Sequence, residues 1–532
     1  MKKLLCAAVV AAVVLIALRW WPQRPLADCF PLSTGVWSAD GELLRVTLAS
    51  DDQYRLWTPL SEISPMVVEA FLLKEDRWFY WHPGVNPVSL ARAGFETYRG
   101  VGHQGGSTLT MQLARMMYHL NTRSVWGKAR QAGIALWLER RYSKCELLEA
   151  YLNFVPFGGN IRGIGAASRI YLGKAPANVT LSEALTLAVI PQRPSIRAGR
   201  SVEEASVVSA RTRLGDAWLA SHPVDDSELR QIELPVILGG SRRLFTLPHA
   251  APHFVDAVLR SGVGYGRIDT TLDAGLQRVV ERQIQRYLTQ YGDRGIHNVA
   301  ALVLDPRDMA VKTWVGSADY WSEAIDGQVN GVLAKRSPGS TLKPFVYALA
   351  LDQGILHPRT MLRDAPTAFG PFTPENFDGH FAGPISAEEA LIRSRNIPAV
   401  WVATQLRQPS LYGFLHNAGI SRMKPESFYG LALALGGGEV TMEELARLYA
   451  MLANQGVLRP LRFESATRVE EGVRLLSPES SFVTLEMLRH NPRPDDDGSI
   501  PVRGSWPIAW KTGTSWGFRD AWSAGVTLNA SP

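Results

Sequence analysis

The sequence predicts a multidomain protein: a mostly helical domain, then an α+β domain, after one apolar N-terminal helix. Its 532 residues exceed what one ordinary hydrophobic core organises, which favours two domains and linkers. Helix-start signals recur through residues 61–222, whereas short β-prone runs appear after residue 270. With 46% hydrophobic and 20% charged residues and no repeat or low-complexity tract, the chain belongs among globular proteins.

The first 21 residues have the pattern of a membrane anchor. Lys2 and Lys3 precede an uncharged run, residues 4–18, which an arginine and two tryptophans follow. The run is short for a spanning helix, so a cleaved signal peptide is the alternative. Because residues 22–29 offer no small-x-small cleavage site, we predict an uncleaved anchor at 1–21, a connecting segment at 22–55, and everything after the anchor outside the cytoplasm.

Charge and cysteine content restrict the partners. The net charge of +6 permits an anionic partner, but no Lys/Arg cluster with interleaved aromatics is present, so we expect no nucleic-acid binding and leave anionic lipid open. Cys6, Cys29 and Cys145 form neither a metal-ligand pair nor an even disulfide set, and only Cys29 with Cys145 could bridge. We predict no protein metal site.

Residues 56–222 are predicted to form the helical domain. Three Ser/Thr-x-x-Glu patterns have the form of capping boxes that open helices: Ser143–Glu146, Thr180–Glu183 and Ser201–Glu204. Apolar residues recur at helical spacing between Leu109 and Leu120.

After a linker or small bridging sheet at 223–268, the α+β domain is predicted to occupy 269–532. Residues 270–277 lead into a helix, and two β-prone runs, 298–304 and 311–315, flank an Asp-Pro turn signal and predict a hairpin. Further capping boxes are expected at Ser386–Glu389 and Thr441–Glu444.

Glu75 is the first candidate catalytic residue. It follows the apolar segment 67–73, and a carboxylate at this position could be a general base. More often, a carboxylate at such a position only marks the solvated end of a helix. Residues 105–110 (Gly-Gly-Ser-Thr-Leu-Thr) open the next helix, whose N–H groups and dipole would suit a phosphate. Alone, this second motif could be only a turn and an N-cap.

Together these motifs resemble the family 51 glycosyltransferases, which elongate peptidoglycan from lipid II. The resemblance covers residues 56–195 and includes Lys144-x-x-x-Leu148-x-x-Tyr151-Leu152-Asn153. It implies a lysozyme-like, mostly α fold, with Glu75 as general base on the acceptor hydroxyl. It also implies a substrate-binding set of Asp76, Phe79, His82, Ser107, Thr108, Gln112 and Asn153.

The departing diphosphate needs positive charge. Lys128, Arg130, the helix terminus or a divalent ion such as Mg²⁺ are candidates to supply it, and no cofactor beyond that ion is expected. Gln131 stands where the glycosyltransferase family usually has a second acidic residue. We interpret Gln131 as a subfamily trait at a substrate-binding position, which puts a role for a second carboxylate in doubt.

Ser340 and Lys343 are one helical turn apart, so the amine could lower the cost of removing the serine proton. A Ser-x-x-Lys match alone is weak. Here Pro338-Gly339 precedes it, and Ser394-Arg395-Asn396 and Lys511-Thr512-Gly513-Thr514 follow in order.

This trio resembles the penicillin-binding transpeptidases over residues 269–526. The resemblance implies Ser340 as acylated nucleophile, Lys343 as its base, and Ser394 and Asn396 as proton relay and orienting pair. It further implies that Lys511, Thr512, Gly513 and Thr514 bind the terminal carboxylate of a stem peptide or β-lactam, and that the N–H groups of Ser340 and Thr514 form the oxyanion hole.

The two resemblances together are those of a class A penicillin-binding protein, and residues 336–345, 435–438 and 509–522 are similar to the 1C branch. They imply a bifunctional peptidoglycan synthase in the bacterial inner membrane with its catalytic domains in the periplasm. The implied partners are lipid II, nascent peptidoglycan, β-lactams, the cytoplasmic membrane and a cell-wall synthesis complex.

The sequence leaves two alternatives open. The family pattern continues beyond Val526 with further sheet, a closing helix and another domain, whereas this sequence stops at Pro532, so we expect a transpeptidase domain truncated at its C-terminal end. One alternative is therefore an active glycosyltransferase with a degenerate transpeptidase domain that serves as a binding or regulatory module. The other is a hydrolase related to serine β-lactamases or carboxypeptidases, against which the N-terminal motifs argue.

Overall fold

The computed structural model describes residues 23–89, 106–122, 124–192, 205–222, 236, 247–262, 266–492 and 506–527. They divide into two compact units, the first built mainly from residues 43–250 and the second mainly from 269–532. The anchor predicted at 1–21, Gly105 and the capping box at Ser201 lie outside the described residues. Among the described helices, none combines the length and the apolar character needed to cross a membrane.

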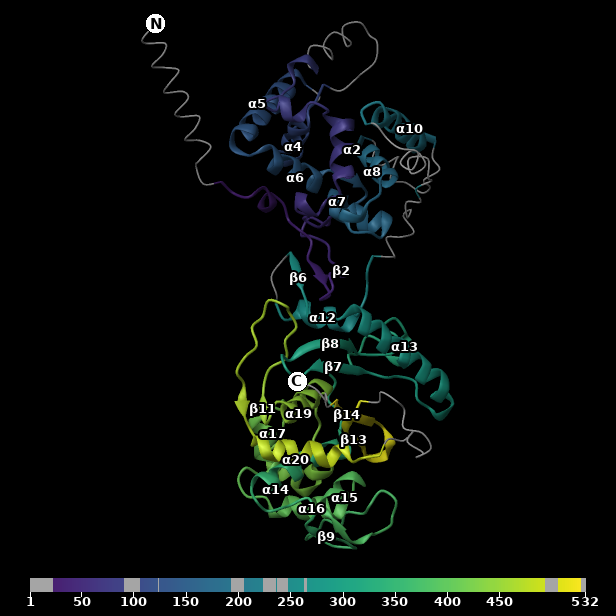
Figure 1. Ribbon diagram of the computed structural model, residues 1–532, viewed down its shortest axis with the longest axis vertical. Helices are drawn as coiled ribbons and strands as arrows, with labels where there is room; N and C mark the ends of the chain where they lie inside the picture. Colours follow the sequence, from purple (N-terminus) through teal and green to yellow (C-terminus); the bar gives the residue numbers. More distant parts are fainter. Residues whose placement is uncertain are drawn as a thin grey trace, which may run out of the picture. The chain divides into compact units, whose positions relative to one another are not determined.

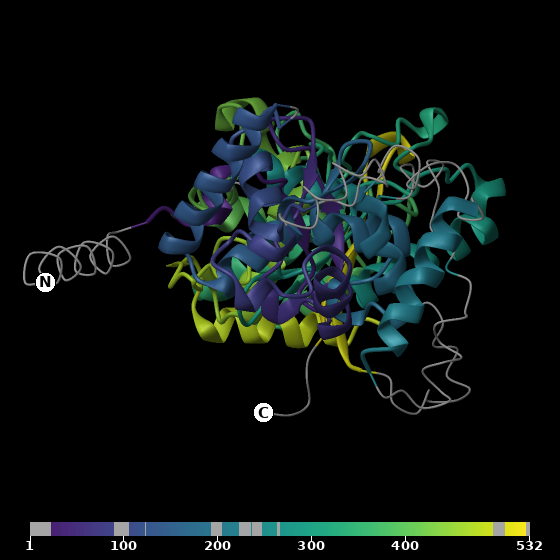
Figure 2. The ribbon, with the colours of Figure 1, turned by 90° about the horizontal axis from the view of Figure 1, so that it is seen from above.

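Unit 1 is mostly helical, as predicted. Its helices gather around α2 and α6, which can be followed in purple and blue in Figures 1 and 2. The main elements are β1 (Gly35–Trp37), β2 (Leu43–Val46), β3 (Tyr54–Arg55), α2 (Pro65–Glu75), α4 (Leu109–Met117), α5 (Val125–Arg141), α6 (Lys144–Phe154), β4 (Pro156–Gly158), β5 (Ile161–Arg162), α7 (Gly163–Ala167), α8 (Leu181–Val189) and α10 (Ala205–Leu219).

The core of unit 1 forms where apolar helix faces meet. Helix α2 packs on α8 and α10, and α4 packs on both α5 and α6. Phe71, Tyr151 and Phe157 are fully buried there, with ring centroids 6.2–6.4 Å apart in edge contacts with Phe71. Tyr151 of α6 thereby lies against Phe71 of α2 in this core.

Local capping starts these helices largely as predicted. Ser143–Glu146 and Thr180–Glu183 are complete capping boxes that open α6 and α8. The predicted helix at 109–120 ends earlier, because α4 stops at Met117, although Leu109 and Leu113 are buried on its inner face.

Unit 2 combines two hairpins with helices. In the first hairpin β7 (Ala301–Asp305) pairs antiparallel with β8 (Ala310–Val315), as the turn signal predicts, and in the second β13 (Ile508–Thr514) pairs antiparallel with β14 (Ala521–Thr527). The other main elements are α12 (Pro252–Arg260), α13 (Ala274–Tyr291), α14 (Lys343–Asp352), β9 (Met361–Asp364), β10 (Gly383–Ser386), α15 (Ala387–Ile392), α16 (Asn396–Gln405), α17 (Leu411–Asn417), α18 (Glu426–Tyr429), α19 (Met442–Ala453), β11 (Val457–Leu458), β12 (Val473–Arg474) and α20 (Pro478–Arg489).

Helices cover the strands of unit 2. Helix α13 packs on β8, α20 packs on β13, and α19 packs on both β7 and β14. Figure 1 shows α14, α15 and α16 beyond α20, on the side away from β7 and β8. The predicted α+β arrangement of sheet and covering helices is therefore present.

Two local expectations for this half need revision. Ser386 caps α15 by accepting from the Glu389 amide, but the Glu389 carboxylate pairs with Arg393 instead of returning to the cap, so only half of that capping box forms. The range 223–268, expected to be a linker or small bridging sheet, contributes most of strand β6 (Arg267–Asp269) to a three-stranded sheet with β1 and β2, but it also holds helix α12. Pro252 starts α12, and Phe254 is fully buried.

Candidate active sites

Glu75 ends helix α2 with its carboxylate largely inside unit 1. Its Oε2 accepts a hydrogen bond from Gln112 Nε2 on α4 at 2.8 Å, while its Oε1 is buried with no hydrogen-bond partner. Burial raises the pKa of Glu75, which the Gln112 hydrogen bond and the charges of Lys74 and Arg115 partly oppose. A carboxylate with a raised pKa and one free oxygen can accept a proton from a substrate hydroxyl.

Asp76 has a different environment, because its oxygens are bonded within the protein. His82 Nε2 lies 2.9 and 3.0 Å from the two carboxylate oxygens, and the Leu109 amide donates to Oδ2 at 3.0 Å. The Gly84 amide donates to the other ring nitrogen of His82, so Nε2 is the nitrogen that donates to Asp76. Asp76 and His82 thus join the exit of α2 to the first turn of α4.

The first backbone amides of α4 are already hydrogen-bonded by the helix N-cap and its neighbours. Thr108 Oγ1 accepts from the Met111 amide at 3.2 Å and donates to the Gly84 carbonyl, while Ser107 is exposed. The amides of Leu109 and Met111, which we expected to be exposed toward a phosphate, are therefore already paired. The positive end of the helix dipole remains as the feature that favours an anion there.

The remaining residues predicted for this site differ in burial. Lys128 and Arg130 are exposed on α5. Gln131 is 2% exposed and donates to the Met111 carbonyl at 2.7 Å, which ties α5 to α4. Asn153 is fully buried and bonds both backbone groups of Thr58, accepting at 2.8 Å and donating at 2.9 Å. Gln131 and Asn153 therefore have scaffold contacts in the structure.

Sequence reasoning missed a network beside this site. Lys144 Nζ donates to the His82 carbonyl at 2.7 Å and to Glu139 Oε1 at 2.8 Å, and lies 4.3 Å from the centre of the buried Phe79 ring. Thr110 Oγ1 donates to the same Glu139 oxygen at 2.6 Å. Glu139 follows Gln131 by eight residues on α5, and this helical spacing is the signal that could have identified it.

The contact of Gln131 predicts that Gln131→Glu destabilises unit 1. An ionised carboxylate cannot donate to the Met111 carbonyl, so we expect a loss of about 2 kcal/mol in the free energy of unfolding near pH 8. Burial should raise the pKa of the new carboxyl in the folded state above its unfolded-state value of about 4.3, so the loss should shrink as the pH falls from the folded-state pKa toward 4.3, because the protonated group can donate.

Chemical denaturation at pH 8 and pH 5 measures this effect. Arg130→Gln, an exposed neighbour on the same helix, is the control and should leave stability unchanged. Equal stability of Gln131→Glu and the parent protein at pH 8 would contradict the assigned contact.

Ser340 lies in a tight 3₁₀ turn, Gly339–Leu342, that leads directly into α14. Two glycines let strand β13 approach this turn: a Cβ on Gly339 would lie 2.4 Å from the Thr514 carbonyl oxygen, and one on Gly513 2.2 Å from the Pro338 carbonyl oxygen. Gly339 also has a positive φ of 54°, which favours glycine. The backbone beside Ser340 is thereby placed next to Thr514, as an oxyanion hole made by their N–H groups requires.

Lys343 is fully buried at the start of α14. Its Nζ donates to the Ser394 carbonyl and to Asn396 Oδ1, both at 2.6 Å, and lies 3.3 Å from Ser394 Oγ. Burial, and then the positive charges of Lys511 and Arg395, hold its pKa well below the ordinary value for lysine, against an opposing effect of Asp364. A lysine with so low a pKa can be neutral and act as a base.

Ser394 occupies a strained backbone position. Its φ is +59°, in the left-handed region that non-glycine residues rarely adopt, and it immediately precedes the residues that begin α16. Such strain persists only where surrounding contacts enforce it. Here it turns both the carbonyl and the hydroxyl of Ser394 toward Lys343.

Most of the predicted transpeptidase residues line one cavity of about 600 Å³. Its lining includes Ser340, Ser394, Asn396, Thr512, Gly513 and Thr514. Lys511, on the same strand as Thr512, is buried, donates to the Thr512 carbonyl at 2.9 Å, and has its pKa lowered to about 8 by burial. The structure therefore brings three separate motifs to one cleft.

The same cavity has walls that the motifs did not predict. Phe377 and Phe518 are both exposed, and their rings approach edge-on with centroids 5.5 Å apart. Asp378 and Arg395 also line it. No sequence pattern identifies these residues, because they reach the cavity only when residues 375–382 fold back on the Ser394 turn.

A helical domain with a buried carboxylate beside a Gly-Ser-Thr helix start, followed by an α+β domain with a Ser-x-x-Lys cleft, defines the two-domain architecture of the penicillin-binding class. The comparisons agree with this class: residues 40–214 match the family model Transglycosylase, and residues 299–523 match the Penicillin binding protein transpeptidase domain. The chain belongs to the class A penicillin-binding proteins.

The similarity to particular members extends over most of the chain. The chain is 40% identical to penicillin-binding protein 1C of Escherichia coli over 95% of its own length, and it spans 64% of the length of that relative. It is 30% identical to penicillin-binding protein 1F of Bacillus subtilis, over 88% of this chain and 68% of the relative. The crystal structure of penicillin-binding protein 1A from Haemophilus influenzae shares the fold, with a TM-score of 0.53, 18% identity, and 93% of this chain and 86% of that chain covered.

Proposed function

We propose that this chain is a bifunctional peptidoglycan synthase that polymerises lipid II into glycan strands and cross-links the stem peptides by serine acyl transfer. The observation that carries the proposal is the position of Lys343, buried against Ser394 and Asn396 beside the cavity that Ser340 lines. A neutral amine in that place has one evident chemical use, which is to take a proton from a nearby hydroxyl.

Acylation would begin when Lys343 takes the proton of Ser340 Oγ and the oxygen attacks the carbonyl carbon of the penultimate D-Ala. The N–H groups of Ser340 and Thr514 would stabilise the oxyanion, and Lys511 with Thr512 and Thr514 would hold the terminal carboxylate. As the C–N bond breaks, the leaving D-Ala amine takes a proton relayed through Ser394. An amine of a neighbouring stem peptide then attacks the ester and releases Ser340. A β-lactam would acylate Ser340 by the same first step.

Glycan polymerisation would depend on Glu75. Its carboxylate would take the proton of the acceptor sugar hydroxyl as that oxygen attacks the anomeric carbon of the donor and the lipid diphosphate departs. Gln112 holds Glu75 by a 2.8 Å hydrogen bond, and the exposed Lys128 and Arg130 are candidates to attract the diphosphate.

A divalent ion at the diphosphate remains a proposal. In the described part of the chain no three His, Cys, Asp or Glu side chains form a group that could hold a metal, and the oxygens of Asp76 are bonded to His82 and Leu109. We therefore name no described side chain as a ligand of Mg²⁺ and assign no step to it.

We further propose a bacterial inner-membrane location, with residues 1–21 as a single-pass anchor and both domains in the periplasm. Lipid II, nascent peptidoglycan and β-lactams would be its ligands, and a cell-wall synthesis complex would be its setting. The order of basic, apolar and aromatic residues at the N-terminus supports the anchor.

Fluorescent penicillin tests the second activity. We expect covalent labelling of the full chain in detergent, loss of the label in Ser340→Ala, and unchanged polymerisation of lipid II by that variant. Ser337→Ala is the matched control, because its hydroxyl donates to the Gly436 carbonyl and serves the fold. A parent protein that polymerises lipid II but takes no label would favour the binding-module alternative, and release of D-Ala without cross-linked dimers would favour the hydrolase.

A further inference from the structure

A buried carboxylate lies behind the Ser394 turn. Asp364, the last residue of β9, is fully buried and accepts hydrogen bonds from Asn376 Nδ2 at 2.7 Å and from the Ala382 amide at 2.9 Å. Arg395 Nε lies 3.5 Å from its Oδ2 as an ion-pair partner. A buried carboxylate with these partners is held firmly in place, and removal of one partner would leave it poorly compensated.

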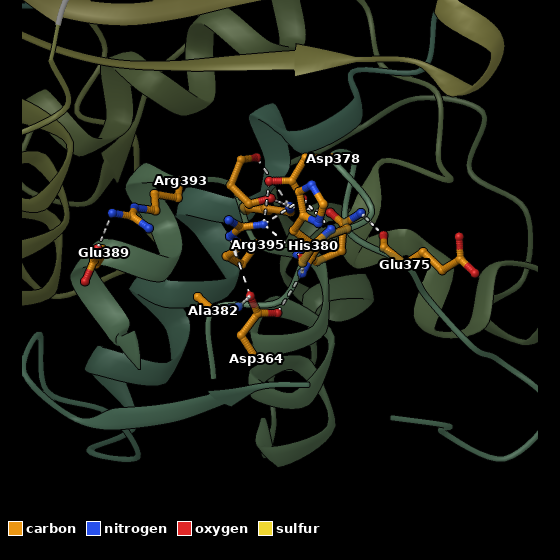
Figure 3. Close-up of polar contacts among 12 residues, drawn as sticks. Asp364, Glu375, Asp378, His380, Ala382, Glu389, Arg393 and Arg395 are labelled. Carbon is orange, nitrogen blue, oxygen red and sulfur yellow. Dashed lines mark hydrogen bonds and ion pairs between the residues drawn. The ribbon is translucent and has the colours of Figure 1, made fainter. Parts of the chain in front are cut away.

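Arg395 connects this buried carboxylate to the cleft. Its Nη1 lies 2.9 and 3.0 Å from the two oxygens of Asp378 and 3.2 Å from the His380 carbonyl. The Arg395 side chain is 12% exposed, whereas that of Asp378 is 47% exposed on the cavity wall. Figure 3 shows Arg395 between Asp364 and Asp378, whereas Arg393 points the other way to Glu389.

The loop Glu375–Ala382 also bonds the catalytic turn directly. The Asn396 amide donates to Asn376 Oδ1 at 2.8 Å, and Asn396 Nδ2 donates to the Glu375 carbonyl at 2.6 Å. Because Asn396 Oδ1 accepts from Lys343, an unbroken chain of contacts runs from Asp364 to the catalytic amine.

We propose that Asp364 and Arg395 form a clamp, the Asp364–Arg395 clamp, that positions the Ser394–Asn396 turn and the 375–382 loop for acylation of Ser340. The clamp accounts for two features that the catalytic roles leave unexplained. One is the strained φ of Ser394, which needs enforcing contacts, and the other is the edge contact of the exposed Phe377 ring with Phe518 on the cavity lining. Neither clamp residue need touch the substrate, so both are positioning residues.

The clamp also contributes charge at Lys343. The charged groups that affect it are Lys511 from β13, Arg395 from the turn before α16, and Asp364 from β9, while Tyr347 of α14 contributes a buried, neutral hydroxyl. Removing the negative charge of Asp364 lowers the pKa of Lys343 further, and removing the positive charge of Arg395 raises it. Because Lys343 must be neutral to act, the acid limb of the pH–acylation profile should move to lower pH in Asp364→Asn and to higher pH in Arg395→Gln.

Two measurements on the full chain test the clamp, and the first rests on the proposed function. Acylation by fluorescent penicillin should slow by at least about tenfold in Arg395→Gln and in Asp378→Asn. The acid limb should shift in opposite directions in Asp364→Asn and Arg395→Gln, and stay in place in Asp378→Asn. Arg395→Lys should be nearly as slow in acylation as Arg395→Gln, because an ammonium cannot span the carboxylates of both Asp364 and Asp378.

The second measurement does not need acylation. Hydrogen exchange of amides in the 375–382 loop should become at least about tenfold faster in Arg395→Gln and Asp378→Asn. Asp308, in the β7–β8 turn, carries a carboxylate that pairs with Arg462. Asp308→Asn is the control and should leave hydrogen exchange in the 375–382 loop unchanged. The exposed Asp378 keeps the test usable if Asp364→Asn fails to fold.

The outcomes separate the clamp from the proposed function. Unchanged loop exchange in both variants, or acid limbs that move together, would overturn the clamp. A parent protein without label whose loop exchange still depends on Arg395 would retain the clamp as a structural feature of an inactive cleft, and would refute only the transpeptidase activity.

Discussion

Replacing Glu75 by Gln is expected to lower the rate of glycan polymerisation from lipid II by about a thousandfold. The amide keeps the size of the side chain and can still accept from Gln112, but it cannot take a proton from the acceptor hydroxyl. Binding of lipid II should be nearly unchanged, so the loss should be in the turnover rate rather than in the substrate concentration required.

The pH dependence gives this prediction a second readout. Burial raises the pKa of Glu75, so polymerisation should fall with decreasing pH earlier than an ordinary glutamate would dictate, as the base becomes protonated. The Gln112 hydrogen bond lowers that pKa, and Gln112→Leu should therefore move the acid limb to higher pH while it also slows the reaction.

Glu69→Gln is the matched control for Glu75→Gln. Glu69 lies on the same helix, its side chain is 52% exposed, and it pairs with His222. Normal polymerisation by Glu75→Gln would remove Glu75 as the base, and equal losses in both variants would point to damage of α2 instead.

Local sequence signals predicted several of the elements. The hydroxyl and carboxylate of Ser143 and Glu146 satisfy amides within one helical turn, so their spacing alone predicts the start of α6. The Asp305-Pro306 turn likewise predicts the β7–β8 hairpin. Helix α12 was missed because Phe254, which anchors it, is stabilised by burial against distant residues rather than by a local pattern.

The same distinction between local and distant contacts applies to the two candidate sites. The order of the motifs predicts which segments meet, but whether a motif residue faces substrate or scaffold depends on burial. Asn153 and Gln131 belong to predicted motifs, yet both are buried and bond backbone groups of other segments. Asp364 belongs to no predicted motif, and it meets Arg395 and the 375–382 loop only in the folded structure, so no spacing rule indicates it.

Replacing Lys343 by Arg is expected to slow acylation of Ser340 by penicillin by about a thousandfold. A guanidinium stays charged at all accessible pH values and cannot take the serine proton. In the parent protein, burial and the charges of Lys511 and Arg395 lower the pKa of Lys343, so a neutral amine is available and the acid limb should lie well below the ordinary lysine pKa.

Lys511 should set the opposite limb of the same profile. It must be protonated to hold a carboxylate, and its pKa of about 8 predicts that acylation declines as the pH rises through that value. Lys511→Arg keeps the charge and should extend acylation to higher pH, whereas Lys343→Arg should be slow throughout. Rates of labelling from pH 5 to 10 measure both, with Lys424→Arg, an exposed lysine over the Phe428 ring, as control. An alkaline limb that Lys511→Arg leaves in place would show that another group controls it, and fast labelling of Lys343→Arg would exclude Lys343 as the base.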